Sequence, residues 1–313
     1  MLVLGSLTHV GMVREVNQDS FCALLAPNAP LGADALLAVA DGMGGHAAGD
    51  VASRLAIQQL VASLSAPSGN SAGDASGNED RLREAVALGN SKVFQASEKP
   101  EYHGMGTTMT AALITGDTAN LVQVGDSRAY LLRDGEFKQI TRDHNWVAEQ
   151  VAAGALTPEE AKTHPRRNVL TRAVGTGPGV DMDSGAVTLK DGDVLLLCSD
   201  GLHGLVRDEE MARVINEQEP QQACQTLVEM ANAAGGTDNS TVIVARVGST
   251  VMTPGERQAA AERLSKTTAH FGPKRRGSGT KALLVLTSPV WGPLWLIWKA
   301  VRYQPEEKKR KRR

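Results

Sequence analysis

Asp41 ends the apolar run ALLAVA at residues 35–40, and it is followed by the glycine-rich stretch GMGGHAAG. A short apolar run that is closed by glycines predicts a buried strand and then a tight turn. The amphipathic residues after Gly49 predict a helix. Hard divalent cations take carboxylate, carbonyl and water oxygens as ligands, so Asp41 could bind a metal beside carbonyl groups that the glycines expose.

The same turn fits a second chemistry, because residues 42–47 match the G-x-G-x-x-A pattern of dinucleotide-binding loops. That pattern also requires an acidic residue about 20 positions later to hold a ribose. After Arg54 the next acidic residue is Asp74, which lies in a low-complexity stretch. The sequence therefore favours the metal hypothesis, which needs other carboxylates in comparable positions.

Four more acidic residues lie where an apolar run meets a turn. Asp126 follows LVQVG, Asp200 follows LLLCS, and Asp238 precedes the apolar run STVIVA. Asp19 ends the N-terminal stretch REVNQD, which begins with Arg14. One Asp beside a glycine is usually a turn residue or a helix N-cap. Five boundaries of the same character predict that the carboxylates converge.

Most of the predicted strands follow one another along the chain, and most of the predicted helices lie before or after them. Helical spacing of apolar residues predicts helices over 50–64 and 80–97, and two more within 208–234. Apolar, alternating or β-rich segments predict strands over 107–114, 119–124, 128–133, 137–141, 193–198 and 241–247. Strands that follow one another with helices at their flanks predict an antiparallel α+β architecture rather than a doubly wound sheet.

Eight short motifs follow one another along the chain, namely RxxNQD (14–19), ADGMGGH (40–46), GMGTT (104–108), VGDSRAY (124–130), TRDHNWV (141–147), HPRRNVLTRAVG (164–175), CSDGL (198–202) and TDNSTVIV (237–244). Together they resemble the metal-dependent serine/threonine protein phosphatases of the protein phosphatase 2C type, in their short bacterial form. The resemblance implies a four-layer αββα sandwich. Two antiparallel sheets would pack together, with helices outside and a dinuclear Mn²⁺ or Mg²⁺ site at one end.

The resemblance also implies a role for each carboxylate. Two divalent ions can lower the pKa of a bridging water and clamp an in-line displacement at phosphorus. In the family, Asp41 would bridge the two ions and the carbonyl of Gly42 would bind the second ion. The other implied ligands are Asp200 and Asp238 on the first ion, Asp19 through bound water, Asp126 with Asp200 on a third and weaker ion, and Asn168, a flap position that sometimes joins the third ion.

Two further side chains are candidates for the chemistry. Arg14 would bind phosphate, because a guanidinium can donate two charge-assisted hydrogen bonds to one phosphate. The alternative for Arg14 is an ordinary surface ion pair. His46 would protonate the leaving seryl or threonyl oxygen, since an imidazole can hold a proton near pH 7. The alternative for His46 is a structural or solvated histidine.

The residues around these candidates have supporting roles in this interpretation. Ser127 and Arg128 are expected to support the loop that carries Asp126. The segment 143–175 resembles the mobile flap of the family, where substrate proteins are selected.

The bulk composition separates the chain into a catalytic domain at 1–248, a linker at 249–281 and a tail at 282–313. Residues 1–248 carry a net charge of −13 and residues 249–313 carry +11. An acidic body argues against a nucleic-acid partner and suits a carboxylate-lined cation site. The three cysteines show neither metal-ligand spacing nor an even count, and no secretion signal is visible, so we expect a cytoplasmic protein.

The tail combines an apolar, Trp-rich segment at 282–301 with the basic end KKRKRR. Such a segment is just long enough to span a bilayer, and its tryptophans suit a membrane interface. Pro289 and Pro293 interrupt a helix, and Lys or Arg flank both ends. A membrane anchor or in-plane segment at the inner membrane face is favoured over a helix that docks on a partner and over a nucleic-acid or localisation signal.

These patterns predict a monomeric enzyme that removes phosphate from phosphoserine and phosphothreonine in proteins and opposes a serine/threonine kinase. The alternative is a catalytically dead phosphatase fold that binds phosphoproteins or regulators. A dead copy would be expected to have lost metal carboxylates. All of them are present here, which favours the enzyme.

Overall fold

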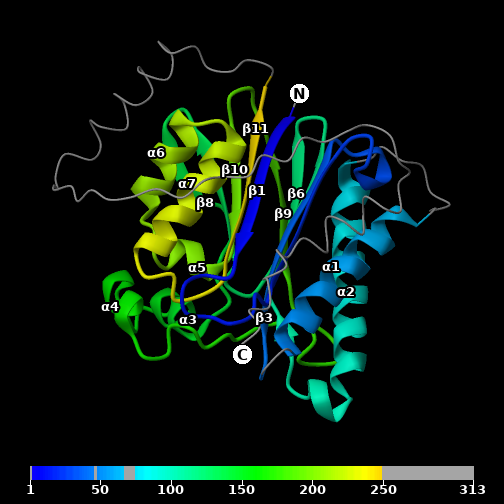
Figure 1. Cartoon of the computed structure of the whole chain (residues 1–313). Coiled ribbons are helices and arrows are strands. Elements are labelled where there is room, and N and C mark those ends of the chain that lie inside the picture. Colours follow the sequence, from blue (N-terminus) through cyan, green and yellow to red (C-terminus); the bar gives the residue numbers. More distant parts are fainter. Residues whose placement is uncertain (1, 46–47, 67–74, 249–313) are drawn as a thin grey trace, which may run out of the picture.

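Two antiparallel sheets pack face to face in the centre of the molecule (Figure 1). The computed structural model describes residues 2–45, 48–66 and 75–248. The first sheet has the order β1 (Leu2–His9), β11 (Ser240–Val247), β10 (Val194–Cys198), β7 (Arg128–Arg133) and β8 (Glu136–Gln139). The second has the order β2 (Asp19–Leu25), β3 (Ala35–Met43), β5 (Met109–Thr115), β6 (Thr118–Val124) and β9 (Asp183–Thr188), and the short β4 (Gly106–Thr107) pairs with β3.

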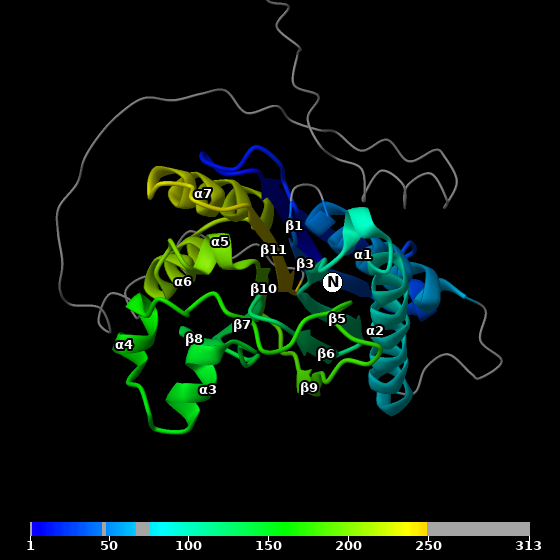
Figure 2. The ribbon, with the colours of Figure 1, turned by 90° about the horizontal axis from the view of Figure 1, so that it is seen from below.

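Helices cover the outer face of each sheet (Figure 2). The second sheet is covered by α1 (Ala48–Ser65) and α2 (Ala75–Ser97), and the first by α5 (Asp200–His203), α6 (Asp208–Glu217) and α7 (Pro220–Ala233). Two short helices, α3 (Trp146–Ala152) and α4 (Pro158–Thr163), lie in the excursion between β8 and β9. Two 3₁₀ turns span Pro30–Gly32 and Pro100–Tyr102. The predicted αββα sandwich is confirmed.

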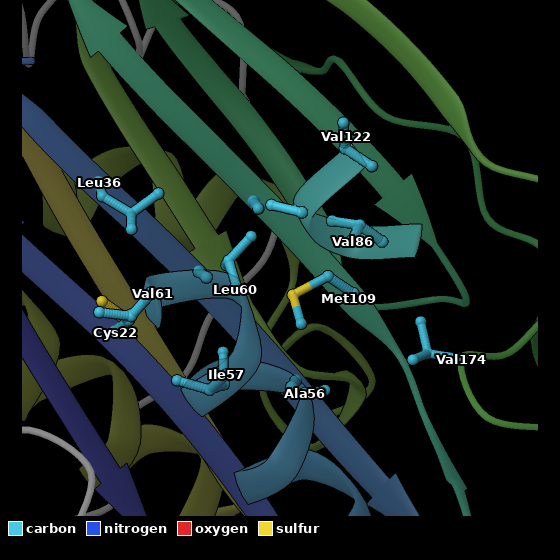
Figure 3. Close-up of a cluster of buried hydrophobic side chains, with 14 of the residues drawn as sticks. Cys22, Leu36, Ala56, Ile57, Leu60, Val61, Val86, Met109, Val122 and Val174 are labelled. Carbon is cyan, nitrogen blue, oxygen red and sulfur yellow. The ribbon is translucent and has the colours of Figure 1, made fainter. Parts of the chain in front are cut away.

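The central strand β3 shows how the sequence builds this sandwich. Side chains along a strand point alternately to its two faces, so a strand that is covered on both faces can be apolar throughout. Leu36 and Ala38 pack toward α1 and α2, whereas Leu37 and Val39 pack between the two sheets, and all four are 0% exposed. Figure 3 shows the α1 side of this core, where Leu36 lies among side chains of both helices.

The expected elements differ from the observed ones at several points. The strand predicted over 107–114 is divided into β4 and β5 at Thr108, where the side-chain hydroxyl instead of the backbone carbonyl accepts from the Asp41 amide. The predicted turn begins too early, since β3 continues through Asp41 to Met43 and pairs there with β4. Strands β1, β2 and β9 were not predicted.

Some predictions fall on residues that the structure does not describe. They concern the predicted proton donor His46, the predicted linker 249–281 and the predicted tail 282–313. Across 2–45, 48–66 and 75–248, no helix combines the length and apolar character that crossing a membrane requires.

Candidate metal centre and active site

Asp19 and Asp41 come from neighbouring strands and lie directly opposite each other in the β2–β3 register. Direct cross-strand partners share one face of a sheet, so the two carboxylates face the same region. Asp19 is buried, and its Oδ2 accepts hydrogen bonds from Ser199 Oγ at 2.8 Å and Thr241 Oγ1 at 2.6 Å. Strand β11 and the residue that follows β10, both from the other sheet, thereby help to hold the Asp19 carboxylate.

The backbone of Asp41 is held by the threonines of the GMGTT motif. Its amide donates to Thr108 Oγ1 at 2.9 Å, and its carbonyl accepts from the Thr108 amide and from Thr107 Oγ1, each at 2.9 Å. Thr108 Oγ1 is in turn 2.7 Å from Ser127 Oγ. Ser127 therefore supports Asp41 through Thr108, a contact that the sequence did not suggest.

Gly42 must be a glycine because α1 begins against it. A Cβ atom on Gly42 would lie 2.0 Å from the backbone carbonyl oxygen of Gly49, which is far inside van der Waals contact. The Gly42 amide donates to the carbonyl of Gln18 at 3.1 Å, which joins this turn to the start of β2. The predicted coordination by the Gly42 carbonyl remains a prediction.

Asp126 and Asp200 approach the same region from the ends of β6 and β10. Asp126 is buried, and its Oδ2 accepts from Asn145 Nδ2 at 3.4 Å. Its carbonyl accepts from His203 Nε2 at 2.9 Å, so this hydrogen bond ties the Asp126 loop to α5, the helix that begins with Asp200. Burial lowers the pKa of His203 to about 3, which keeps this imidazole neutral.

Asp238 lies beside Arg14, whose guanidinium donates to its Oδ2 at 2.7 Å. The side chains are 50% and 30% exposed, so the pair lies at the surface of the site. The adjacent Asn239 is buried and makes three hydrogen bonds of 2.8 to 3.1 Å to backbone atoms of loop 10–18. Asn239 therefore positions the loop that carries Arg14. Sequence reasoning missed this role, although the motif TDNS contains the residue.

The five carboxylates repel one another. Burial, with smaller contributions from Asp200 and Asp238, raises the pKa of Asp19 to about 7. Burial and then Asp200 raise the pKa of Asp126 to about 7. Burial, and after it the charges of the other four aspartates, raises the pKa of Asp41 well above its usual value. A cluster in which each carboxylate disfavours ionisation of its neighbours calls for a counter-cation.

Two oxygens of this cluster have no hydrogen-bond partner. Asp19 Oδ1 and Asp200 Oδ1 are buried and unpartnered among the residues that the structure describes. An unsatisfied buried acceptor is costly, and a divalent cation satisfies carboxylate oxygens. Within the described ranges, no group of three or more His, Cys, Asp or Glu side chains already has the spacing of a complete metal site. The fit to a metal therefore rests on the charge and on the unpartnered oxygens.

The sequence profile of a known protein family matches the part of the chain that carries most of this cluster. The profile described as protein phosphatase 2C matches residues 12–235, which include four of the five aspartates, and Asp238 lies three residues beyond the match. The chain belongs to the protein phosphatase 2C family.

Curated relatives from two bacteria agree with this membership. The chain is 44% identical to the serine/threonine protein phosphatase PstP of Mycobacterium tuberculosis over 240 residues, which are 76% of this chain and 43% of PstP. It is 36% identical to the protein phosphatase PhpP of Streptococcus pneumoniae over 240 residues, which are 76% of this chain and 95% of PhpP. The chain thus spans less than half the length of PstP and nearly all of PhpP.

Solved structures of PstP share the fold. A crystal structure of PstP superimposes with a TM-score of 0.71 and 40% identity, covering 79% of this chain and 99% of that structure. The catalytic domain of PstP in complex with two manganese ions superimposes with a TM-score of 0.67 and 39% identity, covering 80% of this chain and 100% of that structure. The αββα sandwich is therefore the fold of this phosphatase 2C family member.

The segment 143–175, which was predicted to be a flap and is called the flap below, is fastened at its start by a part-buried ion pair. Arg128 donates to both carboxylate oxygens of Asp143, at 2.9 Å from Nε and 2.7 Å from its Nη2 atom, and a further nitrogen donates to Tyr130 Oη at 2.9 Å. Arg128 was expected to support the Asp126 loop. In the structure its guanidinium instead joins β7 to the base of the flap.

The end of the flap is fastened to α2. The buried side chain of Asn90 accepts from the Gly175 amide at 2.7 Å and donates to the Gly177 carbonyl at 3.1 Å. Val174 forms an antiparallel bridge with Thr107, which also contacts Asp41. Asn90 was not singled out from the sequence, because an isolated Asn in a helix has no distinguishing pattern.

A cavity of about 1370 Å³ separates the flap from α5 and α6. It is lined by Asp126 and Asp200 of the carboxylate cluster and by the exposed Asn168 of the flap. The structure thus places Asn168 along the same cavity as the two aspartates predicted for a third ion. The cavity extends from the carboxylate cluster between the flap on one side and α5 and α6 on the other.

Proposed function

We propose that residues 1–248 form a metal-dependent phosphatase that hydrolyses phosphoserine and phosphothreonine in proteins. The observation that carries the proposal is the cluster of five aspartates from both sheets. Burial and neighbouring carboxylates raise the pKa of four of them, Asp19, Asp41, Asp126 and Asp200, and two buried oxygens of the cluster have no hydrogen-bond partner among the described residues. The relatives PstP and PhpP, which are named as protein phosphatases, support it.

Two Mn²⁺ or Mg²⁺ ions would supply positive charge to the phosphoryl oxygens and lower the pKa of a bound water. The complex of the PstP catalytic domain with two manganese ions supports this choice of metal. The residues proposed to hold the ions are Asp41 and the carbonyl of Gly42, with Asp19, Asp200 and Asp238 around them, and Asp126 with Asp200 for a third ion.

Arg14 is proposed to bind the phosphate of the substrate. Its planar guanidinium can donate two parallel hydrogen bonds to a phosphate. The nitrogen that now donates to Asp238 at 2.7 Å would be free to turn to the phosphate once a cation neutralises that carboxylate. Asn239 keeps loop 10–18 in place, so Arg14 stays within reach of the cluster. His46 is proposed to protonate the leaving seryl or threonyl oxygen.

The alternative is a phosphatase fold that binds phosphoproteins without catalysis. Purified full-length protein would first be titrated with Mn²⁺ by calorimetry and then given p-nitrophenyl phosphate. Turnover that requires the bound Mn²⁺ supports the enzyme. Protein with confirmed bound Mn²⁺ and no turnover would establish the binding module instead.

The partners and location are part of the same proposal. The substrates would be phosphoproteins made by a serine/threonine kinase, and the enzyme would act as a monomer in the cytoplasm, attached to the inner membrane face by 282–313. About 15 apolar side chains at roughly 1 kcal/mol each would outweigh two prolines at roughly 3 kcal/mol each. Anionic lipid would attract the basic end.

Truncation after residue 248 tests the attachment separately from the chemistry. Full-length protein should float with anionic liposomes and the truncated protein should not, while both hydrolyse p-nitrophenyl phosphate. Salt should weaken flotation, because the attraction of the basic end is screened. Equal flotation of the two proteins would refute the anchor and favour docking of the tail on a partner protein.

A further inference from the structure

The walls of the cavity beside the carboxylate cluster carry opposite charge. The flap wall carries Arg142, Lys162 and Arg167. The opposite wall is the first turn of α6, which carries Asp208, Glu209 and Glu210. Glu210 is paired with Arg207 of the same wall at 3.3 Å, so Asp208 and Glu209 are the acids of this turn that form no ion pair in the described part of the chain. A chain segment that entered the cavity would therefore meet cations on one side and anions on the other.

The cations of the flap wall are available to a ligand. Arg142 and Arg167 are exposed, and neither forms an ion pair within the described part of the chain. Lys162 is exposed too, and its charge acts on Asp208 across the cavity. By contrast, Arg213 on the α6 wall is already paired with Glu217 at 3.1 Å.

The flap wall is also held in one arrangement. Trp146 of α3 stacks on His164 with ring centroids 4.8 Å apart, and the Arg166 guanidinium lies 5.1 Å from the Trp146 ring centroid. A capping box between Thr157 and Glu160 fixes the start of α4. These contacts fix the segments of the wall near Lys162 and Arg167, and a recognition surface on a fixed segment loses less conformational entropy when a ligand binds.

The cavity is continuous with the proposed catalytic site, because Asp126 and Asp200 line it as well. Its volume of about 1370 Å³ exceeds the roughly 300–1,000 Å³ of small-molecule pockets and suits a peptide segment. A phosphoprotein whose phosphate lies at the cluster would place neighbouring residues in this cavity.

We propose that this cavity binds acidic side chains that flank the phosphorylated residue, with Arg142 and Arg167 as their main contacts. A guanidinium pairs with a carboxylate through two parallel hydrogen bonds. The acidic first turn of α6 repels a carboxylate and so directs it to the flap. The phosphatase therefore selects phosphosites next to Asp or Glu, an inference that rests on the proposed function.

The test uses Mn²⁺-loaded, full-length protein and phosphothreonine peptides of equal length. Four flanking residues, on either the N-terminal or the C-terminal side, are Glu, Gln or Lys. We expect kcat/KM to be about fivefold higher for the Glu peptide than for the Gln peptide on at least one side, since a few exposed charge pairs contribute modestly. The ratio should fall toward one in 0.5 M NaCl, which is about where screening becomes strong.

Variants assign the preference to the flap wall. The double substitution Arg142→Gln/Arg167→Gln should bring the Glu-to-Gln ratio close to one, and Glu209→Gln should increase it. Arg213→Gln, on the opposite wall and already paired, should keep the wild-type ratio. Thermal melting confirms that each variant is folded.

The outcomes separate the two proposals. Hydrolysis of all peptides with Glu-to-Gln ratios below about twofold on both sides would overturn the acidic preference and leave the phosphatase activity standing. A ratio that the double substitution does not change would overturn the assignment to Arg142 and Arg167. Absence of hydrolysis for every peptide would refute the proposed function, and this inference with it.

Discussion

Asp19 and Asp41 are direct partners across the β2–β3 register, so two acidic side chains share one face of the sheet. Like charges in directly opposed positions of a sheet destabilise the fold. Asp200 and Asp238 add to this repulsion from the other sheet. The fold therefore holds a destabilising arrangement that a cation relieves, which is typical of functional sites.

The substitution Asp19→Asn should stabilise the metal-free protein progressively as the pH rises. The folded-state pKa of Asp19 is about 7, above the ordinary aspartate value of 3.8. Between these values the folded protein keeps a proton that the unfolded chain has released. The free energy of unfolding of the wild type therefore falls by up to about 1.4 kcal/mol per pH unit across this window. Asp19→Asn does not lose unfolding free energy in this way, because its amide side chain does not titrate.

Urea unfolding in EDTA at pH 5, 6 and 7 measures the difference between the two proteins. The pKa values of His144 and His203 are lowered, so these histidines act in the opposite direction over part of the window, but they do so equally in both proteins. A difference in unfolding free energy that stays constant with pH would contradict the raised pKa of Asp19.

Gly42→Ala should destabilise the protein, whereas Gly45→Ala should not. A Cβ on Gly42 would lie 2.0 Å from the carbonyl oxygen of Gly49, a backbone atom that cannot move without shifting α1. A Cβ on Gly45 would meet no atom of the described residues within 4 Å. We expect Gly42→Ala to lower the free energy of unfolding by about 2 kcal/mol or more, and Gly45→Ala by less than about 0.5 kcal/mol. Equal losses in urea unfolding would refute the packing argument.

The pair Arg128 and Asp143 should be strongly coupled. Their side chains are 23% and 9% exposed, and removal of one partner leaves the other charge poorly solvated. Asp143→Ala should cost about 3 kcal/mol of unfolding free energy, and the double Ala variant should cost much less than the sum of the single variants.

The exposed pair Arg213 and Glu217 is the matched control for this cycle. Its side chains are 53% and 34% exposed, and such i,i+4 pairs contribute about 0.3–0.5 kcal/mol. If the double-mutant cycle of Arg128 and Asp143 gave a coupling no larger than this control, the flap would not be fastened by that pair.

Arg14→Ala should weaken substrate binding and leave the metal sites in place. The lost charge-assisted hydrogen bonds to phosphate should raise KM for a phosphothreonine peptide by about tenfold or more. Removal of the cation that pairs with Asp238 should not weaken Mn²⁺ binding, because it frees that carboxylate. Calorimetric titration of Arg14→Ala with Mn²⁺ checks this, and loss of Mn²⁺ sites would assign Arg14 to the metal centre instead.

The sequence predicted most of the fold and the identity of the cluster, because apolar runs that end in Asp and Gly mark strand ends that meet. It did not predict β1 and β2. Their side chains alternate only weakly between apolar and polar, and burial there depends on the neighbouring strands. It also missed the partners of Arg128 and Asn90, since both contact residues far away in sequence whose proximity only the tertiary fold creates.

The most direct test of the account is phosphate release from a phosphothreonine peptide while Mn²⁺ is titrated into full-length protein that was first treated with EDTA. A phosphatase that depends on this metal centre should release no phosphate without metal and show saturable release with Mn²⁺. Asp41→Asn should lose at least about a hundredfold in rate, and the exposed control Asp181→Asn should keep the wild-type rate. Release that does not require Mn²⁺, or that is unchanged in Asp41→Asn, would contradict a metal-dependent phosphatase built on this aspartate cluster.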